Sequence, residues 1–121
     1  MSFNRMSVTA LALALAAMTA APAALAHTHV HEMSIADNAK LAASPPDFTF
    51  ELSEAAGLAK VTLADAAGKA IPLAYTPPKD MAASFKIPLP KLDAGAYVLS
   101  FRTIADDGHA MTTAVHFTVT G

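Results

Sequence analysis

The sequence predicts an all-β domain, an immunoglobulin-like β-sandwich of about seven short strands. Apolar and polar residues alternate in several short stretches, most clearly where Phe48, Phe50 and Leu52 share one face. Proline, glycine and aspartate separate these stretches at short intervals, as is typical of strands joined by tight turns. No segment after residue 26 shows a convincing helical spacing.

The strands follow in chain order from these stretches and the breakers between them. Pro72 restricts one strand to a sheet edge, because proline cannot donate a hydrogen bond to a central ladder. Ser53–Ala56 is expected to form at most one helical turn before Gly57. The expected strands cover residues 28–30 with 33–35, 47–53, 58–63, 71–75, 83–87, 95–102 and 113–119, with turns near 37–38, 65–68 and 93–95.

Residues 1–26 have the three parts of a cleaved signal peptide. Arg5 lies in a short polar opening, an apolar run covers Val8–Met18, and the segment ends in the small-x-small site Ala-Leu-Ala. A proline interrupts the apolar stretch, which is therefore too short for a transmembrane helix of about 20 apolar residues. We expect cleavage after Ala26, export, no membrane insertion of the product, and one domain over residues 27–121.

The composition of the mature chain excludes several classes of function. Arg5 is the only one of the eight basic residues within the signal peptide, so the mature chain carries seven basic and ten acidic residues, a formal net charge of −3. That balance gives no attraction to nucleic acid or to an anionic membrane. The chain has no cysteine, hence no disulfide framework and no thiol nucleophile. It also lacks a glycine-rich phosphate loop, a Gly-x-Ser-x-Gly turn and a His-Glu-x-x-His motif, and we do not expect an enzyme.

With these motifs excluded, histidine is the residue type that could support a chemical function. All five histidines follow residue 26, and three of them crowd the new N-terminus. Cleavage after Ala26 frees an α-amine on His27, so the amine nitrogen and ring Nδ1 can chelate one metal ion. These groups have ordinary pKa values near ~8 and ~6.5 and lose their protons at modest cost. Two nitrogens from one residue suit the tetragonal field that Cu(II) prefers.

A further ligand must come from elsewhere in the fold. The best candidate is the segment Asp107-Gly108-His109, which lies between the two strongest expected strands. Gly108 frees the backbone at this point. The Asp-x-His spacing then allows a carboxylate and an imidazole to face one point.

Several segments along the mature chain occur in a distinctive order. In the first half these are His27-Thr-His-Val, Ser34-Ile-Ala-Asp-Asn-Ala-Lys-Leu41 and Pro45-Pro-Asp-Phe-Thr-Phe-Glu-Leu-Ser-Glu54. In the second half they are Leu92-Asp-Ala-Gly-Ala-Tyr97, Phe101-Arg102, Asp106-Asp-Gly-His109 and Phe117-Thr-Val119. Together these segments resemble the CopC family of periplasmic copper-resistance proteins.

The resemblance implies a Greek-key β-sandwich that binds one Cu(II) ion per chain through His27, Asp107 and His109. It also implies a periplasmic protein that buffers, sequesters or carries copper in copper homeostasis and resistance. Its partners would be the copper ion and, for a carrier, a copper transport protein of the inner membrane.

Two departures from the family pattern bear on these expectations. Ile35 and Asn38 stand at the Pro and Gly positions of the family's Ser-Pro-Ala-Asp-Gly turn, and Asn tolerates a left-handed bend. Some members carry a Met-rich loop that binds Cu(I), whereas the mature chain contains only Met33, Met81 and Met111, far apart in sequence. Scattered methionines are more typical of core packing, so no Met-rich Cu(I) site is expected.

His29 offers a rival metal site. A free amine followed by histidine at the third position can wrap Cu(II) in a square plane through the amine, two deprotonated amides and the His29 ring. The alternative is that His29 and His31 are solvated residues of an edge strand. His116 alternates with Val115 and Phe117 and is expected to point outward.

Three function classes follow. The leading one is a copper-binding protein. The first alternative is a histidine-brace copper oxidase or oxygenase, since a similar N-terminal chelate serves oxidative polysaccharide enzymes. Against it, the chain has no Trp and two Tyr, which leaves little for a carbohydrate-binding face. The second alternative is a metal-free immunoglobulin-like interaction module, for which the sequence offers no specific partner surface.

Overall fold

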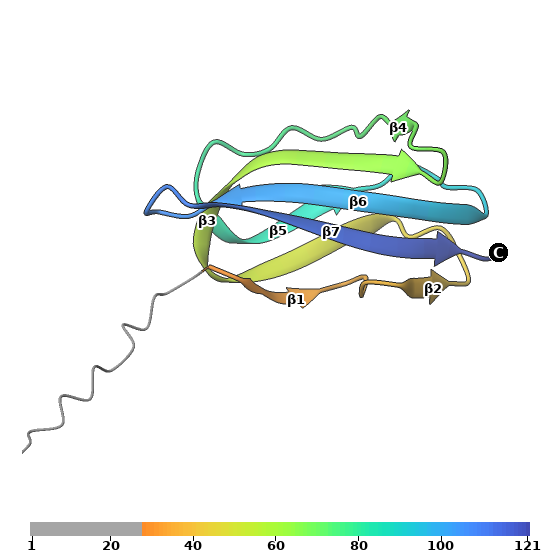
Figure 1. Ribbon diagram of the computed structural model, residues 1–121, viewed down its shortest axis with the longest axis horizontal. Coiled ribbons are helices and arrows are strands. Elements are labelled where there is room, and N and C mark those ends of the chain that lie inside the picture. Colours follow the sequence, from red (N-terminus) through yellow and green to blue (C-terminus); the bar gives the residue numbers. More distant parts are fainter. Residues whose placement is uncertain (1–27) are drawn as a thin grey trace, which may run out of the picture.

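A computed structural model describes residues 28–121, and these form seven β-strands and no helix (Figure 1). The expected signal peptide, residues 1–26, and His27 lie outside the described residues. The expected β-sandwich class is confirmed. The strands are β1 (Val30–Met33), β2 (Ala39–Leu41), β3 (Asp47–Asp65), β4 (Ala70–Ile71), β5 (Ala82–Pro88), β6 (Gly95–Ile104) and β7 (Ala110–Val119).

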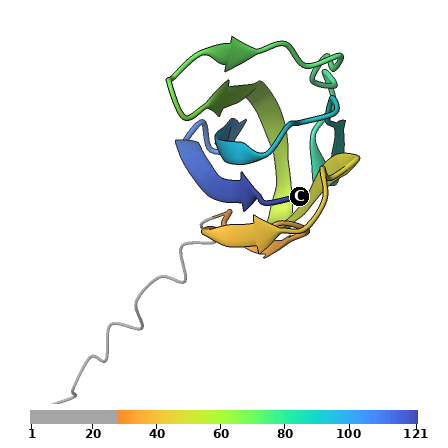
Figure 2. The same ribbon diagram turned by 90° about the vertical axis from the view of Figure 1, so that its right-hand side faces the viewer.

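The strands form two sheets that share β3. The first half of β3 pairs with β1 and with β5. The second half pairs with β4 and β6, and this sheet continues through β7 to β2. Every pairing is antiparallel except that of β2 with β7, which is parallel. Viewed along the strands, the two sheets surround one interior (Figure 2).

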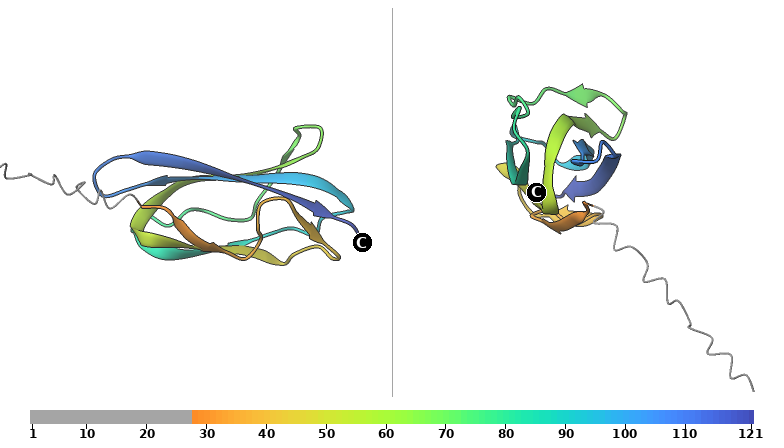
Figure 3. Two further views of the ribbon diagram at one scale, coloured as in Figure 1. Left: turned by 60° about the horizontal axis from the view of Figure 1, so that its bottom comes forward. Right: turned by 90° about the vertical axis from the view of Figure 1, so that its left-hand side faces the viewer.

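β3 runs unbroken over 19 residues, so the helical turn expected at Ser53–Ala56 is wrong. The pairing register shifts after Glu51 on the β5 side and after Leu58 on the β6 side. Between these points the strand bends from one sheet into the other (Figure 3), and residues 53–55 are all exposed. A strand that changes sheets loses its inside–outside alternation there, and this explains why the stretch resembles a turn in sequence.

A cluster of phenylalanine rings joins the two sheets. Phe50 of β3 stacks on Phe101 of β6 with 4.1 Å between ring centroids, and on Phe85 of β5 with 5.1 Å. The common inward face expected for Phe48, Phe50 and Leu52 is confirmed, with exposed fractions of 0%, 3% and 2%. Full burial of a side chain of this size contributes about 1.5–3 kcal/mol, so these rings hold the sheets together.

Tyr97 fixes the start of β6. Its hydroxyl donates to the Asp93 carbonyl oxygen at 2.6 Å, and its ring stacks on Phe117 of β7 with 5.6 Å between centroids. A tyrosine bonded to the backbone a few residues upstream is a feature of immunoglobulin-like Greek-key sandwiches. The contact anchors the expected turn at residues 93–95.

Several element boundaries differ from the sequence-based expectation. The first strand begins only at Val30, and β2 was not expected. The edge strand expected over residues 71–75 shrinks to the two residues of β4. The left-handed bend at Asn38 is confirmed by its φ of 67°. Within residues 28–121 no helix has the length and hydrophobicity to cross a membrane.

Candidate metal site

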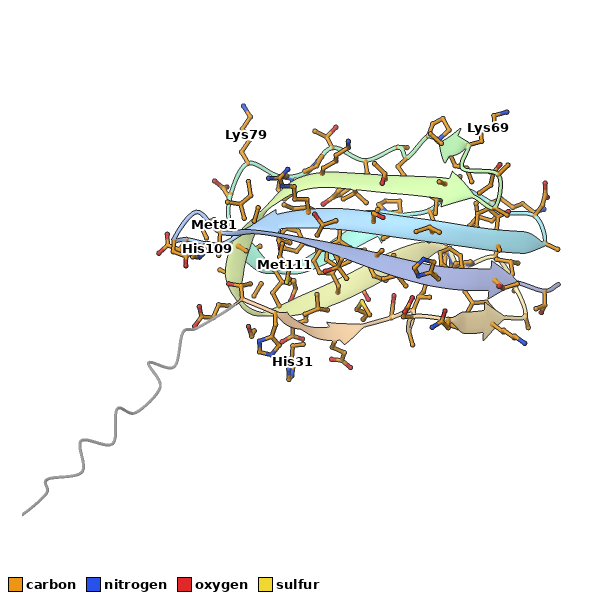
Figure 4. All side chains as sticks on the ribbon, in the orientation of Figure 1. His31, Lys69, Lys79, Met81, His109 and Met111 are labelled. Atoms are coloured by element: carbon orange, nitrogen blue, oxygen red, sulfur yellow. The ribbon has the colours of Figure 1, made fainter. Side chains whose placement is uncertain are left out.

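The loop between β6 and β7 presents His109 at one end of the sandwich (Figure 4). The Ala105 N–H donates to the His109 carbonyl oxygen at 2.8 Å and closes the loop. The Gly108 N–H donates to the Ala105 carbonyl oxygen at 2.9 Å. Gly108 has a φ of 87°, which favours glycine, so the expected backbone freedom at this position is confirmed.

The side chains of Asp107 and His109 are in direct contact. The His109 N–H donates to Asp107 Oδ1 at 3.0 Å, and the ring Nδ1 lies 2.7 Å from Oδ2. The backbone hydrogen bond first, and then the ring contact, lower the pKa of Asp107 below its ordinary value. Both side chains remain open to solvent, with exposed fractions of 58% for Asp107 and 78% for His109. A neutral imidazole held through its Nδ1–H keeps the Nε2 lone pair available for a metal ion.

The bend of β3 brings the start of β1 to the same end as this loop. Ser53 in the bend donates its N–H to the His29 carbonyl oxygen at 2.9 Å, and the His29 N–H donates to Ser53 Oγ at 3.0 Å. Just beyond, Gly57 of β3 pairs with Ile104, the last residue of β6. Figures 1 and 3 both show the start of β1, the bend and the β6–β7 loop together at this end.

A small hollow joins the N-terminal segment to the loop. Thr28, the chain neighbour of His27, lines this hollow together with Asp107 and His109. Thr28 is far from Asp107 and His109 in sequence. The contacts of the β3 bend with His29 and with Ile104 bring the two segments to the same end of the sandwich. The remaining lining residues are Thr103, Ala105, Ala110 and Met111.

His31 lies apart from this hollow. It falls at the irregularity between Val30 and Glu32 in the pairing of β1 with β3, and it is exposed. Its side chain points away from the sandwich (Figure 4). This placement agrees with the interpretation of His31 as a solvated residue of an edge strand.

A second aspartate–histidine pair lies further along β7. Asp37 Oδ1 accepts the His116 N–H at 2.8 Å and lies 3.0 Å from the His116 ring Nδ1. The adjacent Asn38 N–H donates to the His116 carbonyl oxygen at 2.6 Å. The pKa of Asp37 is lowered, chiefly by the backbone hydrogen bond from His116. His116 is exposed as expected, but no sequence pattern pointed to its partner Asp37, because 79 residues separate the two.

Asp107 and His109 together supply a carboxylate and an imidazole nitrogen, a mixed donor pair that Cu(II) accepts. Over the described range 28–121, no group of three or more His, Asp or Glu side chains is placed to hold a metal ion. His27, from which two further nitrogens are expected, lies outside that range.

The fold and the candidate site define the class of this protein: it is a small β-sandwich protein with an exposed Asp-x-His loop at one end. The family model of the CopC domain matches residues 30–120. The chain therefore belongs to the CopC family, and the resemblance seen in the sequence is confirmed.

Solved structures with the same fold include members of this family. CopC from Methylosinus trichosporium OB3b is 24% identical with a TM-score of 0.63, over 78% of this chain and 94% of that one. PcoC, a methionine-rich copper resistance protein from Escherichia coli, is 26% identical with a TM-score of 0.55, over 78% of this chain and 99% of that one. A search of curated proteins finds no match.

Proposed function

We propose that this protein binds one Cu(II) ion at the end of the sandwich where the N-terminal segment meets the β6–β7 loop. The ligands are the α-amine and ring nitrogen of His27 and the His109 ring, together with Asp107, which binds the metal directly or holds the His109 ring through Nδ1. The observation that carries the proposal is that Thr28, which follows His27 in the chain, lines the same hollow as Asp107 and His109. Membership of the CopC family, with the copper resistance protein PcoC among the structural neighbours, supports copper as the metal.

The proposed donors suit Cu(II) at neutral pH. Amine and imidazole nitrogens with a carboxylate oxygen form the N/O set of a tetragonal Cu(II) site. The lowered pKa of Asp107 keeps its carboxylate ionised, so the cation displaces no proton there. Asp107 contributes either as a ligand or by holding the His109 ring through Nδ1, and both roles make it necessary for full affinity.

The rival site built on the His27-Thr28-His29 backbone is less favourable. It requires the His29 amide nitrogen to lose its proton and bind copper. In the folded protein this N–H donates to Ser53 Oγ at 3.0 Å, as part of the contact between the start of β1 and β3. Breaking such a hydrogen bond costs about 0.5–1.5 kcal/mol, which favours the shared site.

We further propose that residues 1–26 direct export to the periplasm and are removed there, since cleavage after Ala26 is what creates the His27 amine. The role is that of a binding protein that buffers, sequesters or carries copper, and not of an enzyme. A carrier would have an inner-membrane copper transport protein as its partner.

The decisive experiment changes only the position of the α-amine. Two forms are prepared, one beginning at His27 and one with a single alanine ahead of His27, and intact mass confirms each N-terminus. Because the extra residue separates the amine from the imidazole chelate, we expect Cu(II) affinity to fall about 100-fold or more in competition with a chromophoric chelator. A third form with one alanine after Gly121 is the matched control and should bind as tightly as the form beginning at His27. Equal affinity in the N-terminally extended form would overturn the proposal.

A further inference from the structure

Met111 lies beside the proposed Cu(II) site. It lines the same hollow as Asp107 and His109. In β7, Val115 and Phe117 are inward and buried, with exposed fractions of 0% and 2%, and Met111 shares their face through the two-residue period of the strand. Met111 is only half-buried, because this face ends at the open end of the sandwich (Figure 4).

Residues with three different donor types therefore line one small hollow. Asp107, His109 and Met111 follow one another at intervals of two residues, and their side chains end in a carboxylate, an imidazole and a thioether. Carboxylates suit hard cations, thioethers suit Cu(I), and imidazole serves both oxidation states of copper. If Met111 served packing alone, a leucine would fill this position equally well.

We propose that His109 and Met111 together bind Cu(I), so that the same end of the sandwich holds copper in either oxidation state. Cu(I) takes the imidazole Nε2 and the thioether sulfur, and Asp107 stays on the Nδ1 side of the ring, where it already lies 2.7 Å away. The inference deepens the proposed function by sharing His109 with it. It does not require the His27 amine.

The other two methionines of residues 28–121 are placed differently and serve as internal controls. Met81 precedes β5, is 44% exposed, and does not line the hollow. Met33 lies in β1 and lines a separate depression with Thr49 and Ser84 on the sheet formed by β1, β3 and β5. Met33 has no histidine among the residues that share its depression.

The test uses the protein beginning at His27, whose methionines are Met33, Met81 and Met111. Each methionine methyl group is labelled with 13C, and Ag(I), a redox-inert ion with the charge and softness of Cu(I), is added during NMR. We expect the Met111 methyl signal to shift and those of Met33 and Met81 to stay in place. Unshifted Met111, or a shift of Met81 alone, would overturn the inference.

Affinity for Cu(I) gives the second measurement, by competition with a Cu(I)-specific chelator under reducing conditions. Met111→Leu keeps the packing volume and should lower Cu(I) affinity about 10-fold or more while leaving Cu(II) affinity within about twofold. Met81→Leu and Met33→Leu should change neither. Unaltered Cu(I) affinity in Met111→Leu would reject this inference without touching the Cu(II) proposal. The form with alanine ahead of His27 should keep its Cu(I) affinity, so the two proposals fail independently.

Discussion

The two aspartate–histidine pairs of this protein contain the same side chains in different settings. Asp107 and His109 are two residues apart, in the exposed loop between β6 and β7. Asp37 and His116 are 79 residues apart, and their contacts attach the turn before β2 to the edge of β7. The ring Nδ1 lies near a carboxylate oxygen in both, at 2.7 Å in the first and 3.0 Å in the second.

The difference lies in what surrounds each pair. The hollow beside Asp107 and His109 is also lined by Thr28, which follows the proposed ligand His27 in the chain. The His116 N–H and the His116 ring both contact the Asp37 carboxylate, and the neighbouring Asn38 N–H donates to the His116 carbonyl oxygen. These contacts join segments that are distant in sequence. We infer that the local pair serves binding and the distant pair serves stability.

Replacing each histidine gives the largest expected contrast. His109→Ala should lower Cu(II) affinity about 100-fold, because it removes a ligand from the shared site. His116→Ala should leave the affinity within about twofold. Chelator competition on the two variants measures both, with electron paramagnetic resonance to follow the ligand field. A Cu(II) spectrum indifferent to His109→Ala would instead support the site built on His29.

Replacing each aspartate sharpens the same contrast with a smaller effect. Asp107→Ala should lower Cu(II) affinity about 10-fold to 100-fold, whether the carboxylate binds copper or orients the His109 ring. Asp37→Ala is the control and should bind as tightly as the wild type. Equal affinities in the two variants would show that the carboxylate of Asp107 has no part in the site.

In thermal unfolding of the metal-free protein, we expect the larger effect from Asp37→Ala and the smaller effect from Asp107→Ala. Asp37→Ala should lower the midpoint by about 2–4 °C, because its contacts close a long stretch of chain that the unfolded state cannot hold together. Asp107→Ala should lower it by about 1 °C or less, because contacts between near neighbours partly persist in the unfolded chain. A larger loss in Asp107→Ala would contradict the assignment of roles.

Lowering the pH should remove the stabilisation of the folded state that Asp37 provides. Its folded-state pKa lies below the ordinary value, so its contribution to stability is complete above about pH 4 and is lost as the pH falls through the folded-state pKa. The difference in melting temperature between the wild type and Asp37→Ala should be constant from pH 7 to about pH 5 and shrink below pH 4. A difference that persists to pH 2.5 would assign the effect to packing alone.

Sequence patterns predicted the parts of the fold that depend on neighbouring residues. The inward face of Phe48, Phe50 and Leu52, the left-handed Asn38 and the open backbone at Gly108 all follow from alternation or from turn chemistry. These features are decided within a few residues. Local patterns are therefore enough to find them.

The errors arose where distant segments decide the structure. The exposed residues 53–55 suggested a turn, and only the sheets on either side show that the strand continues. The partner of His116 was missed because no spacing rule connects it to Asp37. The contact of Asp107 with His109 was accessible from the Asp-x-His spacing. Met111 was interpreted as core packing, and only the folded chain shows that it lines the hollow beside them.

The shared strand β3 also governs how quickly the domain can form. Its pairings join residues far apart in the chain, such as Asp47 with Pro88 and Gly57 with Ile104. Chains dominated by such distant pairings fold in milliseconds to seconds, more slowly than chains built from local contacts. Neither sheet can be completed before β3 is in place, so partly formed intermediates gain little stability. The strand that brings the N-terminal segment to the β6–β7 loop thus also keeps the newly made chain unfolded longer, a delay that would suit the export proposed above.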